Sequence, residues 1–598
     1  MLIKSLNTSH ILDITPGQEI TITLENPLFA DDRMPVPVST GIEFPLSPSN
    51  SKEFGFLDAM LSTPTVQKLP AAIIIGGIEI FTGELQFDEF SDGTLKYTFV
   101  GACSTDSFEG KIHEIECHDY SGMRLSTFVD NARKGAYQDV GLPMIVRKEN
   151  SAKIEYLTKA SNAECSIIDK YANYIYTDEP YIIPALKVGY LLEKIHPDLL
   201  MPSVVADYTD KLAILGTYKP EGWQDERYGI PFTKTTRPVA VYIGKFKPAD
   251  SLPDMTKTVF LTNLLKMFCA TLFPDGSSYK ILTNDSIVKD KSFIDWTDKV
   301  ADGYSIEIDE DSSYTLEYAN PEQNYTPSKE DDLGQEGGVP DGIQTASNYE
   351  ELISKFQSSE DYINVKITTT GNIYSGKVVK ARLYYRFVLG VYGKPPIYND
   401  LETAIPTMDI VYQANVDKIE IAGATADAST YDNSIGFICS KSIPANVAVP
   451  IYQESSYAQV TLREMAPVVE LPTVGGSRPS DVYIGLLIQN NFLDQGNYFA
   501  LPTPYIDGGS EMSDNIFSIA LAGEKGLYNK FHKSFAEWLV KKKDPIKKTV
   551  FLSPSDLALL RLWRKVMVCN QLFIIKTMEL TISDKSDIIF ASASLVKE

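Results

Sequence analysis

Residues 69–87, LPAAIIIGGIEIFTGELQF, constrain the fold of this chain more than any other stretch of its sequence. Two apolar runs flank Gly76 and Gly77. A two-residue hairpin turn needs positive φ at its central positions, and glycine adopts such angles without steric cost. The stretch therefore predicts an antiparallel hairpin that turns at these two glycines.

In the second strand of this hairpin, the apolar residues change from even-numbered to odd-numbered positions. Ile78 and Ile80 fall on one face of the strand, whereas Leu85 and Phe87 have the opposite parity. One extra residue near Gly83 places all four on a common face, so we predict a β-bulge there. A bulge bends and twists a strand, as barrels and curved sheets require.

The length and the aromatic content predict several domains rich in strands. A chain of 598 residues is too long for one core, and its 33 Tyr and 27 Phe favour strands over helices. We predict a mostly β, multi-domain fold with α+β parts. The expected segments are 1–120, rich in strands; 121–250, mixed α/β; 251–319, helix and strand; 320–344, a linker or mobile loop; 345–475, an inserted β-sandwich; and 476–598, α+β and barrel-like.

Helical periodicity is restricted to short stretches. Residues 257–273 predict a helix on the spacing of their apolar side chains. Residues 526–541 predict an amphipathic packing helix, whose aromatic face is typical of a core or a subunit contact rather than of a ligand platform. The aromatic residues of that face are Tyr528, Phe531, Phe535 and Trp538. Ser553, followed by Pro554 and Asp556, predicts the capped start of a further short helix.

The formal charge of −24 argues against sequence-specific binding to nucleic acid, which needs a concentrated Lys and Arg surface. An acidic conduit is nevertheless compatible with the passage of DNA, because like charges prevent adhesion. The acidity serves equally well to keep a large assembly protein soluble.

No pattern of residues predicts a metal ion, a cofactor or catalysis. On a strand, His113 and Cys117 would lie on one face and His118 on the other, so HEIECH cannot supply three ligands to one zinc. GNIYSGKV, residues 371–378, has the spacing of a phosphate loop, but Val378 replaces the hydroxyl that binds Mg²⁺. Both flanks of that motif predict strands, which favours a hairpin turn. There is no HExxH and no GxSxG, so we expect a protein that is not an enzyme and has no cofactor.

The six cysteines show no CxxC spacing, which is typical of a reducing compartment. The first 20 residues contain no continuous apolar region of the kind that a signal peptide requires. The longest apolar stretches are shorter than the 18 or so residues of a membrane helix, so we expect no membrane span.

Three parts of the sequence together resemble tail proteins from phages and prophages of gut anaerobes. The first is GIEFPLSPSNSKEFGF followed by the hairpin and LKYTFVGA. The second covers residues 257–303 and includes FIDWTDKV; the third is YNKFHKSFAEWL followed by TVFLSPSDLALL. The matching positions are Pro48, Asn50, Phe54, Gly55, Gly77, Ile78, Ile80, Phe81, Gly83, Asp295, Trp296 and Lys299.

This resemblance implies a baseplate hub or tail-tip protein. Such hubs carry two related tail-tube-like β-barrel domains per subunit, and three subunits imitate the sixfold tail tube. Segments 1–120 and 476–598 are then the expected barrels of a homotrimer. The expected ring interface contains Gly76, Gly77, Ile78, Phe81 and Gly83.

The resemblance also implies partners and a location. The partners are the tail tube, the tape-measure protein and other baseplate or tail-tip proteins. The protein is then made in the host cytoplasm, becomes part of the virion at its tail tip or baseplate, and serves tail assembly and DNA ejection.

Segment 345–475 has no counterpart in the resemblance, and we expect it to be an insertion exposed at the tip. Its tyrosines suit either a sandwich core or stacking on host-surface glycan. Those tyrosines are Tyr374, Tyr384, Tyr385, Tyr392 and Tyr398. The alternatives to a hub are a receptor- or glycan-binding tail protein and, without any supporting motif, a cell-wall hydrolase.

Overall fold

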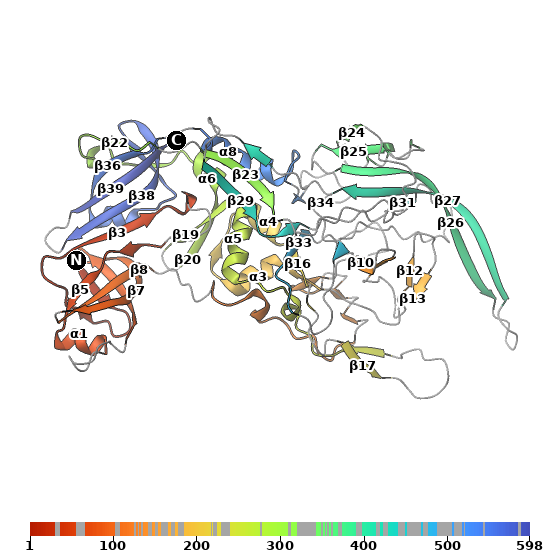
Figure 1. Cartoon of the computed structure of the whole chain (residues 1–598), viewed down its shortest axis with the longest axis horizontal. Helices are drawn as coiled ribbons and strands as arrows, with labels where there is room; N and C mark the ends of the chain where they lie inside the picture. Colours follow the sequence, from red (N-terminus) through yellow and green to blue (C-terminus); the bar gives the residue numbers. More distant parts are fainter. Residues whose placement is uncertain are drawn as a thin grey trace.

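The computed structural model of the chain describes residues 1–29, 36–55, 66–101, 108–124, 184–216, 240–319, 477–486 and 517–598, apart from gaps of one to four residues within these ranges. Between these ranges it describes mainly strands. The fold is mostly β with α+β parts and has several sheets, which confirms the predicted fold class. Figure 1 shows a two-part sheet unit at one end, a mixed central part, and a long hairpin at the other end.

The largest sheet has 14 strands and joins the two ends of the sequence. Its main path runs in the order β2-β1-β6-β7-β8-β4-β3-β38-β39-β36-β22, while β5 pairs with β8 and β21 with β37. Its strands are β1 (Leu2–Ser5), β2 (Ile11–Leu12), β3 (Glu19–Glu25), β4 (Val38–Ser39), β5 (Ile42–Pro45), β6 (Lys68–Ile75), β7 (Ile78–Ser91), β8 (Thr94–Gly101), β21 (Phe293–Asp295), β22 (Ser305–Ile306), β36 (Ile546–Leu552), β37 (Lys565–Val568), β38 (Gln571–Ser583) and β39 (Ile589–Lys597).

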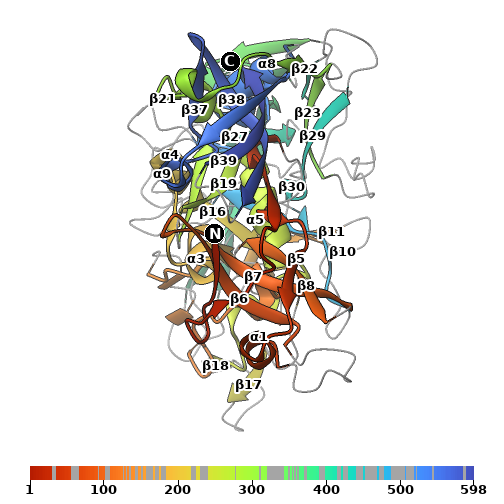
Figure 2. The same cartoon turned by 90° about the vertical axis from the view of Figure 1, so that its left-hand side faces the viewer.

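Two lobes make up this sheet. The N-terminal lobe consists of β1, β2 and β4 to β8 with helix α1 (Pro48–Glu53). The C-terminal lobe consists of β21, β22 and β36 to β39 with helix α9 (Pro554–Leu559). Figure 2 shows the C-terminal lobe above the N-terminal lobe, with α1 at the lower end.

Strand β3 connects the two lobes. All seven of its residues pair with β38, from Glu19 opposite Ser583 to Glu25 opposite Thr577. Alternate residues of β3 are buried, and they belong to a single apolar core that both lobes share. Segments 1–120 and 476–598 therefore build one continuous sheet; in the described pairings this sheet stays open, with β2 and β22 at the ends of its main path. Two separate closed barrels remain a prediction.

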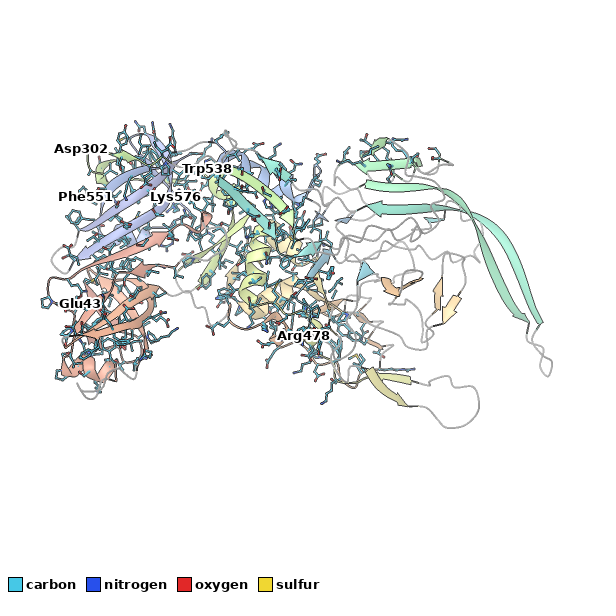
Figure 3. The ribbon with its side chains drawn as sticks, viewed as in Figure 1. Glu43, Asp302, Arg478, Trp538, Phe551 and Lys576 are labelled. Carbon is cyan, nitrogen blue, oxygen red and sulfur yellow. The ribbon has the colours of Figure 1, made fainter. Side chains whose placement is uncertain are left out.

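Asn26 fixes the joint between the lobes. Its side chain is 1% exposed and donates to the carbonyl oxygens of Leu562, at 2.8 Å, and Ile575, at 2.7 Å. Its backbone N–H donates to the carbonyl of Lys576, where the β38–β39 register shifts by one residue. Lys576 lies in the C-terminal lobe in Figure 3. A residue of the N-terminal segment thus binds the carbonyls of a bulge in the C-terminal lobe.

The central part packs short helices and small sheets around a second apolar core. Its helices are η1 (Pro27–Phe29), η3 (Ile112–Glu114), α3 (Val188–Ile195), α4 (Ser203–Thr209), η4 (Pro248–Ser251), α5 (Lys257–Met267), α6 (Asn284–Lys289), the π-helix η6 (Tyr528–His532) and α8 (Lys533–Leu539). The short helix η5 (Thr297–Lys299) belongs instead to the C-terminal lobe, where it contacts β36. Its strands are β9 (Val140–Gly141), β14 (Ala185–Lys187), β15 (Leu199–Leu200), β16 (Leu212–Leu215), β19 (Ala270–Asp275), β20 (Ser278–Thr283), β23 (Ser312–Tyr318), β28 (Ile419–Ile421), β29 (Ser429–Ile435), β30 (Ile438–Cys439) and β33 (Tyr483–Leu486).

The predicted helix over residues 257–273 is wrong in its second half. Helix α5 ends at Met267, and Cys269 has a φ of 44°, which turns the chain sharply. The next residues form β19, which pairs with β20. Leu272 has helical spacing in the sequence but lies buried in a strand, because the hairpin with β20 overrides the local pattern.

Two helix boundaries follow the sequence signals. Helix α3 ends at Ile195 with His196 as its cap, directly before Pro197. Helix α9 begins with the predicted capping box, in which the Ser553 hydroxyl accepts from the Asp556 N–H and the Asp556 carboxylate accepts from the Ser553 N–H. Both termini are therefore set locally.

The far end of the molecule carries a five-stranded sheet in the order β24-β25-β26-β27-β31. Strands β26 (Ile373–Leu389) and β27 (Ile397–Gln413) pair along all 17 residues of each and reach well beyond the rest of the sheet (Figure 1). The expected hairpin at the phosphate-loop-like motif is present: β25 and β26 pair antiparallel, with Lys366 opposite Ile373, so the chain reverses at the start of the motif. The residues Gly376, Lys377 and Val378 lie after the turn, inside β26. The other strands here are β24 (Ile343–Ala346), β25 (Ile363–Ile367) and β31 (Val449–Pro450).

The expected sandwich of residues 345–475 contributes strands to more than one sheet. Strands β28 and β29 pair with β23 in the central part and not with β26 or β27. The boundaries of this domain and of the others stay predictions, and the side chains of the five tyrosines considered for glycan binding lie outside the described part. The remaining strands are β10 (Val146–Glu149), β11 (Lys153–Tyr156), β12 (Ser166–Ile168), β13 (Tyr174–Tyr176), β17 (Gln224–Tyr228), β18 (Ala240–Ile243), β32 (Val468–Val469), β34 (Tyr505–Ile506) and β35 (Phe517–Ser518).

Candidate assembly surfaces

The tip of the β6–β7 hairpin contacts the C-terminal lobe of the same chain. Gly76 and Gly77 form the turn with φ values of 56° and 83°, between the paired residues Ile75 and Ile78. A Cβ on Gly76 would lie 2.9 Å from Cγ and 3.3 Å from Cβ of Pro554, the first residue of α9. The tip is thus a lobe–lobe contact within one chain.

The bulge lies three residues before the predicted position. Phe81 pairs with Ile73 and Glu79 with Ile74, so the extra residue is Ile80 and not Gly83. Gly83 has a different role, because it lies opposite Gly101 on β8. A Cβ on Gly83 would lie 2.2 Å from the carbonyl oxygen of Val100. Glycine is needed here for the close approach of two backbones rather than for a bulge.

Replacing Gly83 by alanine is therefore expected to destabilise the N-terminal lobe by about 2 kcal/mol, because the methyl group meets backbone atoms that cannot rotate away. A fall in the thermal unfolding midpoint would measure this effect. Gly77→Asn is the matched control: its Cβ meets nothing within 4 Å, and asparagine tolerates positive φ. Equal midpoints for the two variants would contradict the close approach.

The predicted interface residues are only partly available to a partner. Ile78 and Phe81 are half-buried and Gly83 is buried, while Gly76 lies against Pro554. The structure brings the five residues together on one hairpin. Their role in a ring stays a prediction.

A repeat relates the two lobes, and the periodicity arguments miss it. Residues 46–50 read LSPSN and residues 552–556 read LSPSD. Each pentapeptide starts a helix of six residues, α1 or α9, with the serine as N-cap and the first proline at the start of the helix. The Ser47 hydroxyl accepts from the Asn50 N–H at 3.2 Å, as that of Ser553 does from Asp556, also at 3.2 Å.

The strands around the two helices repeat as well. The strand before α1, β5, pairs with β8, and the strand before α9, β36, pairs with β39. After each helix the chain forms two successive antiparallel hairpins, β6–β7–β8 or β37–β38–β39. The first hairpin turns at Gly76 and Gly77 in one lobe and at Cys569 and Asn570 in the other, where φ is 50° and 60°. The two lobes are therefore variants of one supersecondary unit.

The predicted packing helix begins as the π-helix η6 and continues as α8. Phe531, Phe535 and Trp538 are buried in the central core, and Tyr528 packs against it partly buried. Trp538 lies in the central part of the molecule in Figure 3. In this chain the aromatic face therefore contributes to the fold of the subunit.

His532 on the same helix is a buried polar residue that the sequence patterns do not reveal. It is 0% exposed, and its Nε2–H donates to the Met267 carbonyl at 3.0 Å. Its Nδ1 accepts from the Tyr314 hydroxyl, to which Asn433 Nδ2 donates at 2.9 Å. Burial lowers the pKa of His532 from 6.5 to about 4, so the imidazole is neutral. The network connects four distant segments.

The HEIECH segment does not form the strand that we expected. His113 lies in the short helix η3, and its Nδ1 is 4.0 Å from an oxygen of Asp254. Burial raises the pKa of the Cys117 thiol to about 11, so this thiol is neutral at neutral pH. Across the described ranges, no three His, Cys, Asp or Glu residues are grouped closely enough to hold a metal ion. None of the described helices is long and apolar enough to cross a membrane.

Exposed apolar side chains mark the outer face and one edge of the C-terminal lobe. Phe551 and Phe590 are 40% and 50% exposed, and they form a cross-strand pair with ring centroids 5.5 Å apart. Ile306 on the edge strand β22 is 56% exposed, and Ile308 just beyond it is 85% exposed. Figure 3 places Phe551 on the outside of this lobe. Exposed aromatic and aliphatic residues on a sheet are typical of a contact surface.

No family model matches the sequence, and no curated protein matches it. Among the solved structures that are similar to this chain, two are phage tail proteins at 8% sequence identity. One is the 43 kDa tail protein of prophage MuSo2 from Shewanella oneidensis, with a TM-score of 0.29 over 100% of this chain and 98% of that one. The other is the tail protein from Neisseria meningitidis MC58, with a TM-score of 0.31 over 100% and 96% of the two chains.

Proposed function

We propose that the chain is a structural protein of a phage tail and forms a hub or tip ring at its distal end. The repeat of two lobes within one continuous sheet carries this proposal, because a hub of this kind supplies two related tube-like units from each subunit. The sequence resemblance within residues 41–102, 257–303, 528–539 and 549–560 supports the same conclusion. Three copies then give six similar lobes around one axis.

The proposed role is mechanical. Sheet edges and exposed apolar residues such as Phe551 and Phe590 would be covered in the ring and by the neighbouring tail proteins. The shared apolar core, the capped helix α9 and the hydrogen bonds of Asn26 would hold the two lobes in a fixed arrangement for this role. We propose the tail tip or baseplate of the virion as the location and the tail tube as the neighbouring structure.

The mass of the purified full-length chain in solution tests this proposal. Light scattering over a concentration series is expected to give three times the chain mass of 66.5 kDa. A mass of one chain at every concentration, together with clearing of host peptidoglycan in a zymogram, would instead indicate a cell-wall hydrolase. A trimer that produces no clearing agrees with the structural role.

A further inference from the structure

Each lobe has a hairpin tip and a short capped helix. The tip of the N-terminal lobe contacts the helix of the C-terminal lobe, whereas the tip of the C-terminal lobe and the first residue of the helix of the N-terminal lobe are both exposed. The N-terminal tip, at Gly76, meets Pro554 on α9 of the C-terminal lobe. By the repeat, the equivalent of Gly76 is Cys569, because each is the first residue of a two-residue turn. The equivalent of Pro554 is Pro48, because each follows the capping serine of its helix. The second contact of the same kind would therefore join Cys569 to Pro48.

The pair Gly76 and Pro554 differs from the pair Cys569 and Pro48 in solvent exposure. Pro554 is half-buried beneath the Gly76 turn, whereas Pro48 is exposed. Cys569 and Asn570 at the other tip are exposed as well. Helix α1 lies at the free end of the N-terminal lobe, on the side away from the C-terminal lobe (Figure 2). One tip and one helix surface thus stay uncovered, in positions equivalent to a contact that the chain already makes.

We propose that the tip at Cys569 and Asn570 docks on helix α1 at Pro48 of a second copy of this chain. The contact is heterologous: a tip on one copy meets a helix on the next, so repetition closes a ring when the rotation between copies fits. The inference rests on the proposed ring and specifies which surfaces form it. Each lobe then contacts the next in the same way, alternately within and between chains.

The internal contact also predicts the spacing of the new one. A Cβ at residue 76 lies 3.3 Å from Cβ of Pro554. Disulfides join Cβ atoms about 3.5 to 4.5 Å apart, so a cysteine at residue 48 would lie within reach of the native Cys569 of the neighbouring copy. A single substitution, Pro48→Cys, therefore provides the test.

The experiment uses the full-length Pro48→Cys variant, purified reduced and then oxidised with copper phenanthroline. Non-reducing electrophoresis is expected to show covalent dimers and trimers that disappear on reduction. Pro48→Cys in a Cys569→Ser background is the matched control, because it keeps the new thiol and removes only its partner. Gly76→Cys with Pro554→Cys, also in the Cys569→Ser background, should form a bond within one chain and yield no covalent oligomers.

Light scattering of the reduced Pro48→Cys variant separates the possible failures. A trimer without a bond that depends on Cys569 would overturn the docking contact and leave the ring intact. A monomer at all concentrations, for both this variant and the wild type, would overturn the ring and the contact together. A second variant, Cys569→Arg, should convert the trimer into a folded monomer that still unfolds cooperatively; a persisting trimer would also overturn the contact.

Discussion

Replacing Asn26 by alanine is expected to destabilise the two-lobed sheet by about 4 kcal/mol. The substitution leaves the carbonyls of Leu562 and Ile575 and the N–H of Leu28 without the partner that each has in the fold. An unsatisfied buried polar group costs about 1–3 kcal/mol, and three lose their partner at once. The loss falls on the joint of the sheet, so both lobes should loosen together.

Hydrogen exchange of the β3 and β38 backbone amides measures this effect at the joint. Asn26→Asp is the informative second variant, because it keeps the acceptor for Leu28 but turns carboxylate oxygens towards two carbonyls. It should destabilise at least as much as alanine does. Glu43→Ala, on an exposed position of β5 (Figure 3), should change protection little. Near-wild-type protection in Asn26→Ala would show that Asn26 does not hold the lobes together.

Acidification is expected to weaken the central core through His532. In the fold its pKa is lowered to about 4, whereas in the unfolded chain it is near 6.5. Neutral His532 is therefore compatible with the fold, and the unfolded chain takes up the proton first as the pH falls. The contribution of neutral His532 to the free energy of unfolding is fully present above pH 6.5 and is lost as the pH approaches 4. The free energy of unfolding is expected to fall by about 3 kcal/mol between pH 7 and pH 4. A proton on Nδ1 would also oppose the Tyr314 hydroxyl that donates to it.

The measurement is the protection of the α5 amides against exchange, corrected for the intrinsic pH dependence of the exchange rate. His532→Gln should be less stable at pH 7 but should lack this part of the pH dependence. Tyr314→Phe keeps the buried imidazole and removes only the hydroxyl. This variant should be less stable than the wild type at every pH, but its stability should fall with decreasing pH as steeply as that of the wild type. If the stability of His532→Gln falls with decreasing pH as steeply as that of the wild type, groups other than His532 cause the pH dependence.

Local signals predict the elements whose cause is local. The turn at Gly76 and Gly77, the cap at Ser553 and the end of α3 before Pro197 follow from the residues themselves. The end of α5 could not be predicted in this way, because Leu272 has helical spacing and only its pairing in the β19–β20 hairpin places it in a strand. The position of the bulge could not be predicted for a similar reason. The alternation of apolar residues requires one extra residue in the strand, but only the pairing with β6 shows that this residue is Ile80 and not Gly83.

The residues of the candidate site that depend on distant partners were the hardest to predict. Asn26 is an ordinary turn residue until residues 562–576 are placed beside it. His532 is one of five histidines and carries no motif, and its partners lie in segments more than 90 residues away. The repeat of the lobes was readable as LSPSN and LSPSD, since a local capping signal marks each copy.

The pairing of β3 with β38 sets the order in which this protein can be completed during synthesis. The chain leaves the ribosome from its N-terminus, so β3 and Asn26 emerge long before their partners, which lie up to 549 residues later in the sequence. Until then one edge of β3 is without its partner strand and the shared core lacks its second half. A nascent chain therefore depends on protection of this edge, and a chain released before residue 577 cannot close the joint. The sheet that both lobes share can therefore close only after β38 has been synthesised.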